Sequence, residues 1–173
     1  MGGNLLITVG ALALLSILIL TVNNNIMNNQ VSLTESEIVI TGVSLAQSLI
    51  DEIKTKAFDQ VEITGTINSP NDLTSSLGPE TGENISMPDT SSSQSFSSLT
   101  TYNDVDDYNG YSRLVNTDIA ENFLLTCQVQ YVSVSNPNSV SGTRTYCKRI
   151  TITVTSPFFS TLPSVQISSA VTY

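Results

Sequence analysis

The chain has 173 residues, enough for one domain with an extension, and 6 basic against 15 acidic residues give it a net charge of −9. This excess of acid, without any cluster of Lys or Arg, argues against binding to nucleic acid. Histidine, the commonest general base and metal ligand, is absent, so we expect a protein that is not an enzyme.

The first part of the chain, residues 1–34, contains no charged side chain. Within it, the run from Leu5 to Val22 is almost continuously apolar. As a helix it would reach about 27 Å, close to the thickness of a bilayer's hydrocarbon core. A secretory signal peptide has a basic start, a shorter apolar region and a small-residue cleavage site, and this run matches none of the three. We therefore expect a retained membrane anchor rather than a cleaved signal.

The apolar run continues into an amphipathic pattern that reaches Phe58 without a proline. Apolar residues recur there at steps of three and four, which places one stripe on one helical face: Val39, Val43, Ala46, Ile50, Ile53 and Ala57. Lys54 and Lys56 follow near the end, where cations complement the exposed carbonyl groups. The pattern predicts a long helix over residues 1–58, followed by a head over residues 59–173.

The head begins with two segments that differ in residue composition and pattern. Residues 61–67 alternate between apolar and other side chains, which predicts a short strand. Residues 68–101 are rich in Ser, Thr, Pro and Gly and too poor in apolar residues to form a core, so we expect a surface loop. The alternative is a loop that is ordered by neighbouring subunits and O-glycosylated. Asn84 begins an Asn-Ile-Ser motif, an acceptor for N-glycosylation.

The last third predicts an antiparallel sheet. Apolar residues alternate from Phe123 to Tyr131, a turn-rich stretch covers residues 135–139, and residues 143–155 are dense in β-branched side chains. A final alternating strand is expected over residues 165–173.

The two cysteines, Cys127 and Cys147, lie at equal distances from residue 137. A hairpin centred there would set them opposite each other, within bridging reach, so we predict a structural disulfide and an environment outside the cytoplasm. Along the same strand, positions that alternate with Cys147 are occupied by Ile150, Ile152 and Val154, so these apolar side chains would point to the opposite face. Their burial requires a β-bulge or a second buried face.

An acidic stretch precedes this sheet and contains Asp104, Asp106, Asp107 and Asn109, next to Gly110. Carboxylate and amide oxygens are the ligands of hard cations, so one hypothesis is a calcium site formed by these four side chains. The alternative is a turn in which the side chains cap the backbone and tyrosines pack beneath. No other constellation in the sequence suggests a cofactor.

The order of these segments resembles the type IV pilin and pseudopilin superfamily: an apolar N-terminal run, an amphipathic helix, a loop and a late sheet with two cysteines. The stretch from Asp104 to Tyr111 resembles a motif of minor pilin-like proteins of the mannose-sensitive haemagglutinin type. The helix end, Lys-Ala-Phe-Asp at residues 56–59, is similar to that of other bacterial pilin-like proteins. Leu5 stands where such pilins usually carry glutamate.

This resemblance implies an α+β fold in which a long N-terminal apolar α-helix packs on an antiparallel β-sheet head. It also implies a structural subunit of an extracellular type IV pilus-like filament, a homo-oligomer assembled through its helix. Such a subunit is held in the bacterial inner membrane and handled by the pilus assembly machinery before it joins the filament at the cell surface. The alternative is a minor pseudopilin or a membrane-anchored periplasmic component of a type II-like secretion system.

Overall fold

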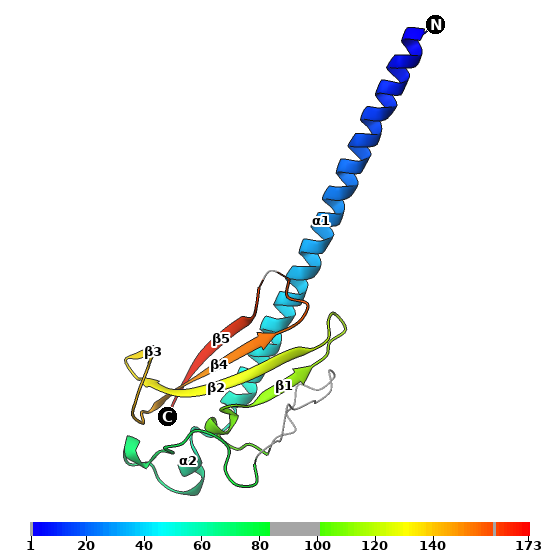
Figure 1. Ribbon diagram of the computed structural model, residues 1–173. Helices are drawn as coiled ribbons and strands as arrows, with labels where there is room; N and C mark the ends of the chain where they lie inside the picture. The colour runs from blue at the N-terminus through cyan, green and yellow to red at the C-terminus, as the bar shows by residue number, and fades with distance from the viewer. Residues whose placement is uncertain (1, 84–100, 161) are drawn as a thin grey trace. The chain divides into compact units, whose positions relative to one another are not determined.

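The computed structural model describes residues 2–83, 101–160 and 162–173 (Figure 1). Its helices are α1 (Gly2–Lys54) and α2 (Gln60–Thr64), with two 3-10 helices, η1 (Pro70–Asp72) and η2 (Asp106–Tyr108). Its strands are β1 (Ser112–Val115), β2 (Phe123–Ser133), β3 (Asn136–Val140), β4 (Cys147–Thr155) and β5 (Val165–Thr172). The chain divides into two compact units, Met1–Glu37 and Ile38–Tyr173.

An antiparallel sheet forms the centre of the second unit (Figure 1). Its strands follow the order β1-β2-β4-β5, and β3 pairs separately with the end of β2. Phe123 of β2 lies opposite Val115 of β1, and Ile152 of β4 lies opposite Ile167 of β5. Strands β1 and β2, and strands β4 and β5, are consecutive antiparallel neighbours, whereas β3 lies in the connection between β2 and β4.

One face of this sheet is covered by the last third of α1. The helix contributes side chains one turn apart to the core: Leu45, Ala46, Leu49, Ile50 and Ile53. The alternate positions of β2 and β4 supply the other side of the same core: Phe123, Leu125, Cys127, Val129, Ile150, Ile152 and Val154. Gly42 allows close approach, since a Cβ atom there would lie 3.0 Å from the ring of Phe159. The α+β fold expected from the sequence, with its apolar N-terminal helix packed on an antiparallel sheet, is confirmed.

The strand expected over residues 61–67 is wrong, because helix α2 occupies its first half. Asp59 caps this helix, its side chain accepting a hydrogen bond from the backbone N–H of Val61 at 3.2 Å. Glu62 reaches back and accepts from the backbone N–H of Phe58 at 2.7 Å. These bonds satisfy backbone groups that a helix start leaves open, so an acid followed three residues later by Glu outweighs the alternation of apolar residues.

The predicted disulfide is also wrong, because Cys127 and Cys147 are free, buried cysteines. The register places Ile152, not Cys147, opposite Cys127. Cys147 lies about five positions before Ile152 in β4, which corresponds to roughly 17 Å along the strand. The hairpin is not centred on residue 137, since β3 begins at Asn136 and folds back on the end of β2. The cysteines also lie on opposite faces of the sheet, because Cys127 shares a face with its partner Ile152, whereas Cys147 has the other parity.

The same register explains which face of the sheet each residue of β4 points to. Lys148, Ile150, Ile152 and Val154 share the face that packs toward α1, while Cys147 is buried on the other face opposite Thr172 of β5. The second buried face considered from the sequence is therefore present at the start of this strand.

Candidate functional site

The first unit carries a continuous apolar surface. The exposed large apolar side chains of α1 before Ile38 are Ile7, Val9, Leu12, Leu14, Leu15, Ile17, Leu18, Ile19, Leu20, Val22, Ile26, Met27, Val31 and Leu33. Leu14, for example, is 70% exposed. They occupy every face of the helix rather than one stripe, which is typical of a helix surrounded by an apolar medium.

The hydroxyl groups of this segment are satisfied within the helix. Ser16 and Thr21 donate to the carbonyl groups of Leu12 and Ile17, four residues earlier, each at 2.9 Å. Backbone and hydroxyl groups of the apolar run thus need no water, as a lipid or protein environment requires. By length and composition α1 is able to cross a membrane, and its most apolar window is 0% buried, unlike the core helix of a soluble protein.

The aspartate stretch of the second unit forms a tight, self-capped turn around η2. Asp104 Oδ1 accepts hydrogen bonds from the backbone N–H groups of Asp106 and Asp107 at 2.9 and 3.2 Å. Asp107 Oδ2 accepts in turn from the N–H groups of Asn103 and Asp104 at 2.8 and 3.1 Å. Gly110 closes the turn with φ of 85°, a conformation that favours glycine. The side-chain to backbone bonds of the turn hypothesis are therefore present.

Three tyrosines pack around this turn. The rings of Tyr102, Tyr108 and Tyr111 meet edge to face, with centroids 5.0 to 5.8 Å apart. Tyr108 donates from its hydroxyl to Glu52 Oε1 at 2.8 Å, and Arg113 holds the other oxygen of Glu52 at 2.7 Å. The turn is thereby fixed to the end of α1 and to β1, so its aspartates have little freedom to move.

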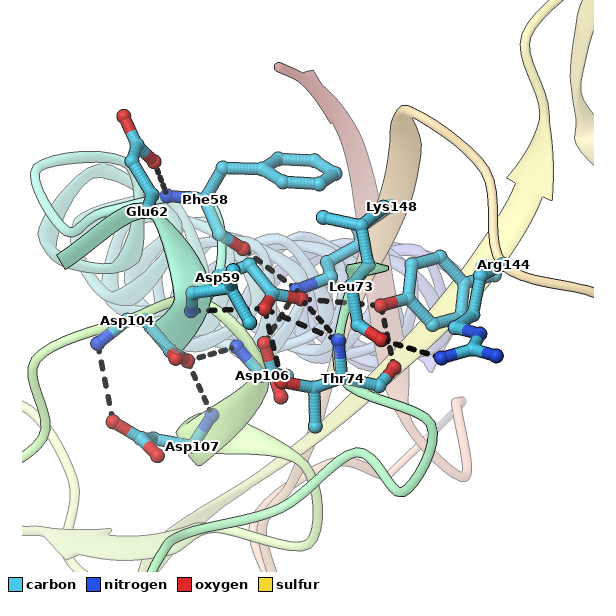
Figure 2. A network of polar contacts seen from close by, with 12 residues as sticks. Phe58, Asp59, Glu62, Leu73, Thr74, Asp104, Asp106, Asp107, Arg144 and Lys148 are labelled. Carbon is cyan, nitrogen blue, oxygen red and sulfur yellow. Dashed lines mark hydrogen bonds and ion pairs between the residues drawn. The ribbon is translucent and has the colours of Figure 1, made fainter. Parts of the chain in front are cut away.

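A fully buried lysine lies beside the turn (Figure 2). Lys148 of β4 donates to Asp59 Oδ2 at 2.9 Å, to the carbonyl of Phe58 at 2.6 Å, and to Asp106 Oδ1. Its ammonium also lies 4.6 Å from the ring centroid of Phe58 and 5.4 Å from that of Tyr131. The charge of Lys148 is therefore paired and hydrogen-bonded, the condition under which a protein interior tolerates it.

Asp59 connects this lysine to the segment after α2. Its carboxylate accepts from the backbone N–H and the hydroxyl of Thr74 and, at 3.2 Å, from the hydroxyl of Tyr131 (Figure 2). Burial alone would raise the pKa of Asp59, but the hydrogen bond and charge of Lys148, aided by the other donors, hold that pKa below its ordinary value. Asp59 is therefore the ionised partner of Lys148.

The other carboxyl groups of the cluster are perturbed in the opposite direction. Burial, followed by the charges of Asp106 and Asp107, raises the pKa of Asp104 to about 8. Burial also raises the pKa of Asp106, although Lys148 opposes the change. Glu80 joins this group, and its pKa is raised to about 7 by burial and then by the neighbouring carboxyls of Asp107 and Glu83. Negative charge is thus crowded into one place.

Two sets of carboxylate oxygens are close enough to share a cation. The oxygens of Glu80, Asp104 and Asp106 lie within 4.8 Å of one another, and so do those of Glu80, Glu83 and Asp107. Two of the four predicted ligands, Asp104 and Asp106, therefore share a set with Glu80, and a third, Asp107, shares the other set with Glu80. The fourth, Asn109, uses its amide elsewhere: its oxygen accepts from the backbone N–H of Val129 at 3.1 Å, and its nitrogen donates to the carbonyl of Leu77 at 3.1 Å.

Sequence reasoning missed Glu80, Glu83, Asp59 and Lys148. The two glutamates lie in a segment expected to be a plain surface loop, and no local spacing connects them to the aspartates. Lys148 had a detectable signal, since it shares its parity with Ile150 and its apolar neighbours in a strand with one buried face. The predicted glycosylation site at Asn84 lies outside the described residues, as does the second half of the Ser/Thr-rich stretch up to residue 100.

Comparison with known proteins adds no relative. No protein-family model, curated protein or solved structure matches this chain.

Proposed function

We propose that the chain is a structural subunit of an extracellular type IV pilus-like filament that assembles through its N-terminal helix. The observation that supports this proposal is the uncharged helical surface of the first unit, which is apolar on every face and exposed. A surface of this extent is unstable in water and needs either lipid or other apolar protein as its surroundings.

The helix suits both environments in turn. In the inner membrane it lies among lipid tails, and in a filament it packs against the same helix of neighbouring copies. Because both surroundings are apolar, transfer from membrane to filament has no large desolvation cost. The folded second unit, with its charged surface, stays in water throughout. The absence of charge before Glu35 is compatible with this exchange, since a single charge would resist one environment or the other.

The experiment is electron microscopy of material sheared from cells that express the unmutated chain, with labelling by an antibody to the second unit. Labelled filaments are the expected result. Chain confined to the membrane fraction would refute the filament and favour the alternative, an anchored component of a secretion system.

A charged substitution within the helix tests whether its apolar surface drives filament assembly. Leu14→Asp should abolish filaments, because an acidic side chain at the centre of an apolar helix costs about 2.5–3.5 kcal/mol on insertion scales, before any loss of packing. The matched control is Val134→Asp, which places the same charge at an exposed apolar position of the second unit. Normal filaments from Leu14→Asp would show that this surface is not buried on assembly.

A further inference from the structure

The aspartate turn contains buried oxygen atoms that lack a hydrogen-bond donor among the described residues. They are Glu80 Oε2, Asn103 Oδ1, Asp104 Oδ2, Asp106 Oδ2 and Asp107 Oδ1. The three aspartates are 0% exposed, so water does not solvate these oxygens from outside. A buried carboxylate oxygen without a partner is strongly destabilising, and several in one place require a common explanation.

The cation beside them does not supply the missing bonds. Lys148 is fully engaged by Asp59, by the carbonyl of Phe58 and by the other oxygen of Asp106. One ammonium thus faces both Asp59 and the carboxyl groups of the turn. The remaining negative charge must be met by protons shared between the carboxyls or by a bound cation.

We propose that Glu80, Asp104, Asp106 and Asp107, with the amide oxygen of Asn103, bind a calcium ion. The donors are all oxygen, which selects a hard cation and disfavours zinc or copper. Calcium takes six to eight oxygen ligands at about 2.3–2.6 Å, so ligand oxygens on opposite sides of the ion lie about 5 Å apart. The carboxylate oxygens of Glu80, Asp104 and Asp106 lie within 4.8 Å of one another, which fits that dimension, and Asp107 lies within the same distance of Glu80 in the second set. Magnesium demands a smaller octahedral shell and keeps several waters, for which a buried set of carboxylates is poorly suited.

The ion joins two segments that are distant in sequence. Glu80 comes from the segment after η1, and the aspartates come from the turn around η2. Other bonds already hold these segments together: Asn103 donates to Glu83 Oε1 at 2.6 Å, and Asn109 donates to the carbonyl of Leu77. Calcium completes this attachment and neutralises the carboxylates that crowd there, so it stabilises the second unit. This role does not depend on filament formation.

The test uses the full chain in a non-ionic detergent, stripped of metal with EGTA and dialysed. Isothermal titration with calcium chloride measures binding, and thermal unfolding is followed by tyrosine fluorescence. This signal reports the second unit alone, because the chain has no tryptophan and its 6 tyrosines all lie between Tyr102 and Tyr173. We expect saturable binding, a melting temperature higher by several degrees with calcium, and a clearly smaller effect of magnesium at the same concentration.

Variants connect the binding to these residues. Glu80→Gln removes one ligand charge without touching the Lys148 pairs and should weaken calcium binding by about tenfold or more, since ligand charge tunes the affinity. Glu121→Gln, which removes the same charge at an exposed position, is the matched control and should bind as the unmutated chain does. Asp107→Asn is a second ligand variant, with the same loss expected.

Two outcomes overturn the proposal. If the unmutated chain shows neither heat of binding nor a change in melting temperature, the carboxyls are held by shared protons. If calcium binds equally well to Glu80→Gln and to Glu121→Gln, the ion occupies some other place. Neither outcome affects the electron-microscopy test of the filament.

Discussion

The buried lysine of β4 gives the sharpest test of how the second unit is stabilised. Lys148→Met removes the ammonium but keeps an unbranched apolar side chain that fills the space between Phe58 and Tyr131. The carboxylates of Asp59 and Asp106 then remain buried without their cation. Removing one partner of a buried ion pair costs about 3–5 kcal/mol, because the other charge is left uncompensated.

This cost is large relative to the total free energy of unfolding of a domain. A domain is stabilised by about 5–15 kcal/mol, so the variant loses a substantial part of its free energy of unfolding. With a denaturant slope of about 1–3 kcal/mol per molar urea, the midpoint of urea unfolding should fall by about 2 M. Tyrosine fluorescence of the full chain in detergent, at one fixed calcium concentration, measures this midpoint.

Two further variants identify the cause. Arg149→Met removes the neighbouring cation, which is half-buried and donates to the carbonyl of Asn138, and should cost about 1 kcal/mol. Adding Asp59→Asn to Lys148→Met removes one of the stranded charges and should recover part of the loss, a non-additivity that signals direct coupling. A loss below about 1 kcal/mol in Lys148→Met, or additive effects in the double variant, would falsify the idea that this ion pair stabilises the fold.

Two other predictions concern the same unit. Cys127 and Cys147 should be unreactive toward alkylating reagents in the native protein, because both are buried and burial raises the pKa of each thiol. Both should be labelled in denaturant without a reductant, and a single unreactive pair under those conditions would show a disulfide after all. The low pKa of Asp59 stabilises the fold above the ordinary carboxyl pKa, and this contribution is lost as the pH falls through the lower folded value. The urea midpoint should therefore fall below about pH 4 in the unmutated chain, and less steeply in Lys148→Met; equal slopes would contradict the assignment.

The parts of the fold that depend on local pattern were predictable from the sequence. The apolar run and the stripe around Ala46 and Ile50 define α1, and the alternation from Phe123 to Tyr131 defines β2, because helix and strand each repeat within a few residues. The capped start of α2 was equally local, but its Asp-to-Glu signal competed with an alternating pattern that suggested a strand.

Register could not be predicted in the same way. The predicted disulfide assumed that the hairpin turns at residue 137, whereas β3 takes up that segment and shifts the pairing of β2 with β4. A shift of this kind changes no local pattern, since both strands keep their alternation. Only the pairing of whole strands decides which residue faces Cys127, and that pairing is a tertiary property.

In the acidic cluster, too, one part was predictable from local sequence and another part depends on tertiary packing. Asp104, Asp106 and Asp107 lie in one short stretch, so the sequence predicted that they act together. Glu80 and Lys148 reach them from segments on either side of the turn in the sequence. Their approach depends on how the segments that carry them pack within the second unit, and no spacing rule describes that. The electrostatics follow from the same packing, because the raised pKa values of the turn arise mainly from burial.

The two proposals meet in the charge of the second unit. Every charged side chain of this chain lies at or beyond Glu35, and the second unit, residues 38–173, holds 13 acidic and all 6 basic residues, so it carries −7 of the net charge of −9. In the proposed filament, copies that associate through uncharged helices would bring these acidic units close together, where like charges repel one another over about one Debye length, roughly 8 Å in physiological salt. A calcium ion bound in the turn lowers the net charge of each copy by two, to about −7. It would do so without using the apolar helical surface on which the proposed assembly rests, because the turn lies in the second unit and that surface lies in the first. If both proposals hold, the apolar helix supplies the attraction between copies, and the ion both stabilises the second unit and weakens the repulsion that opposes this attraction.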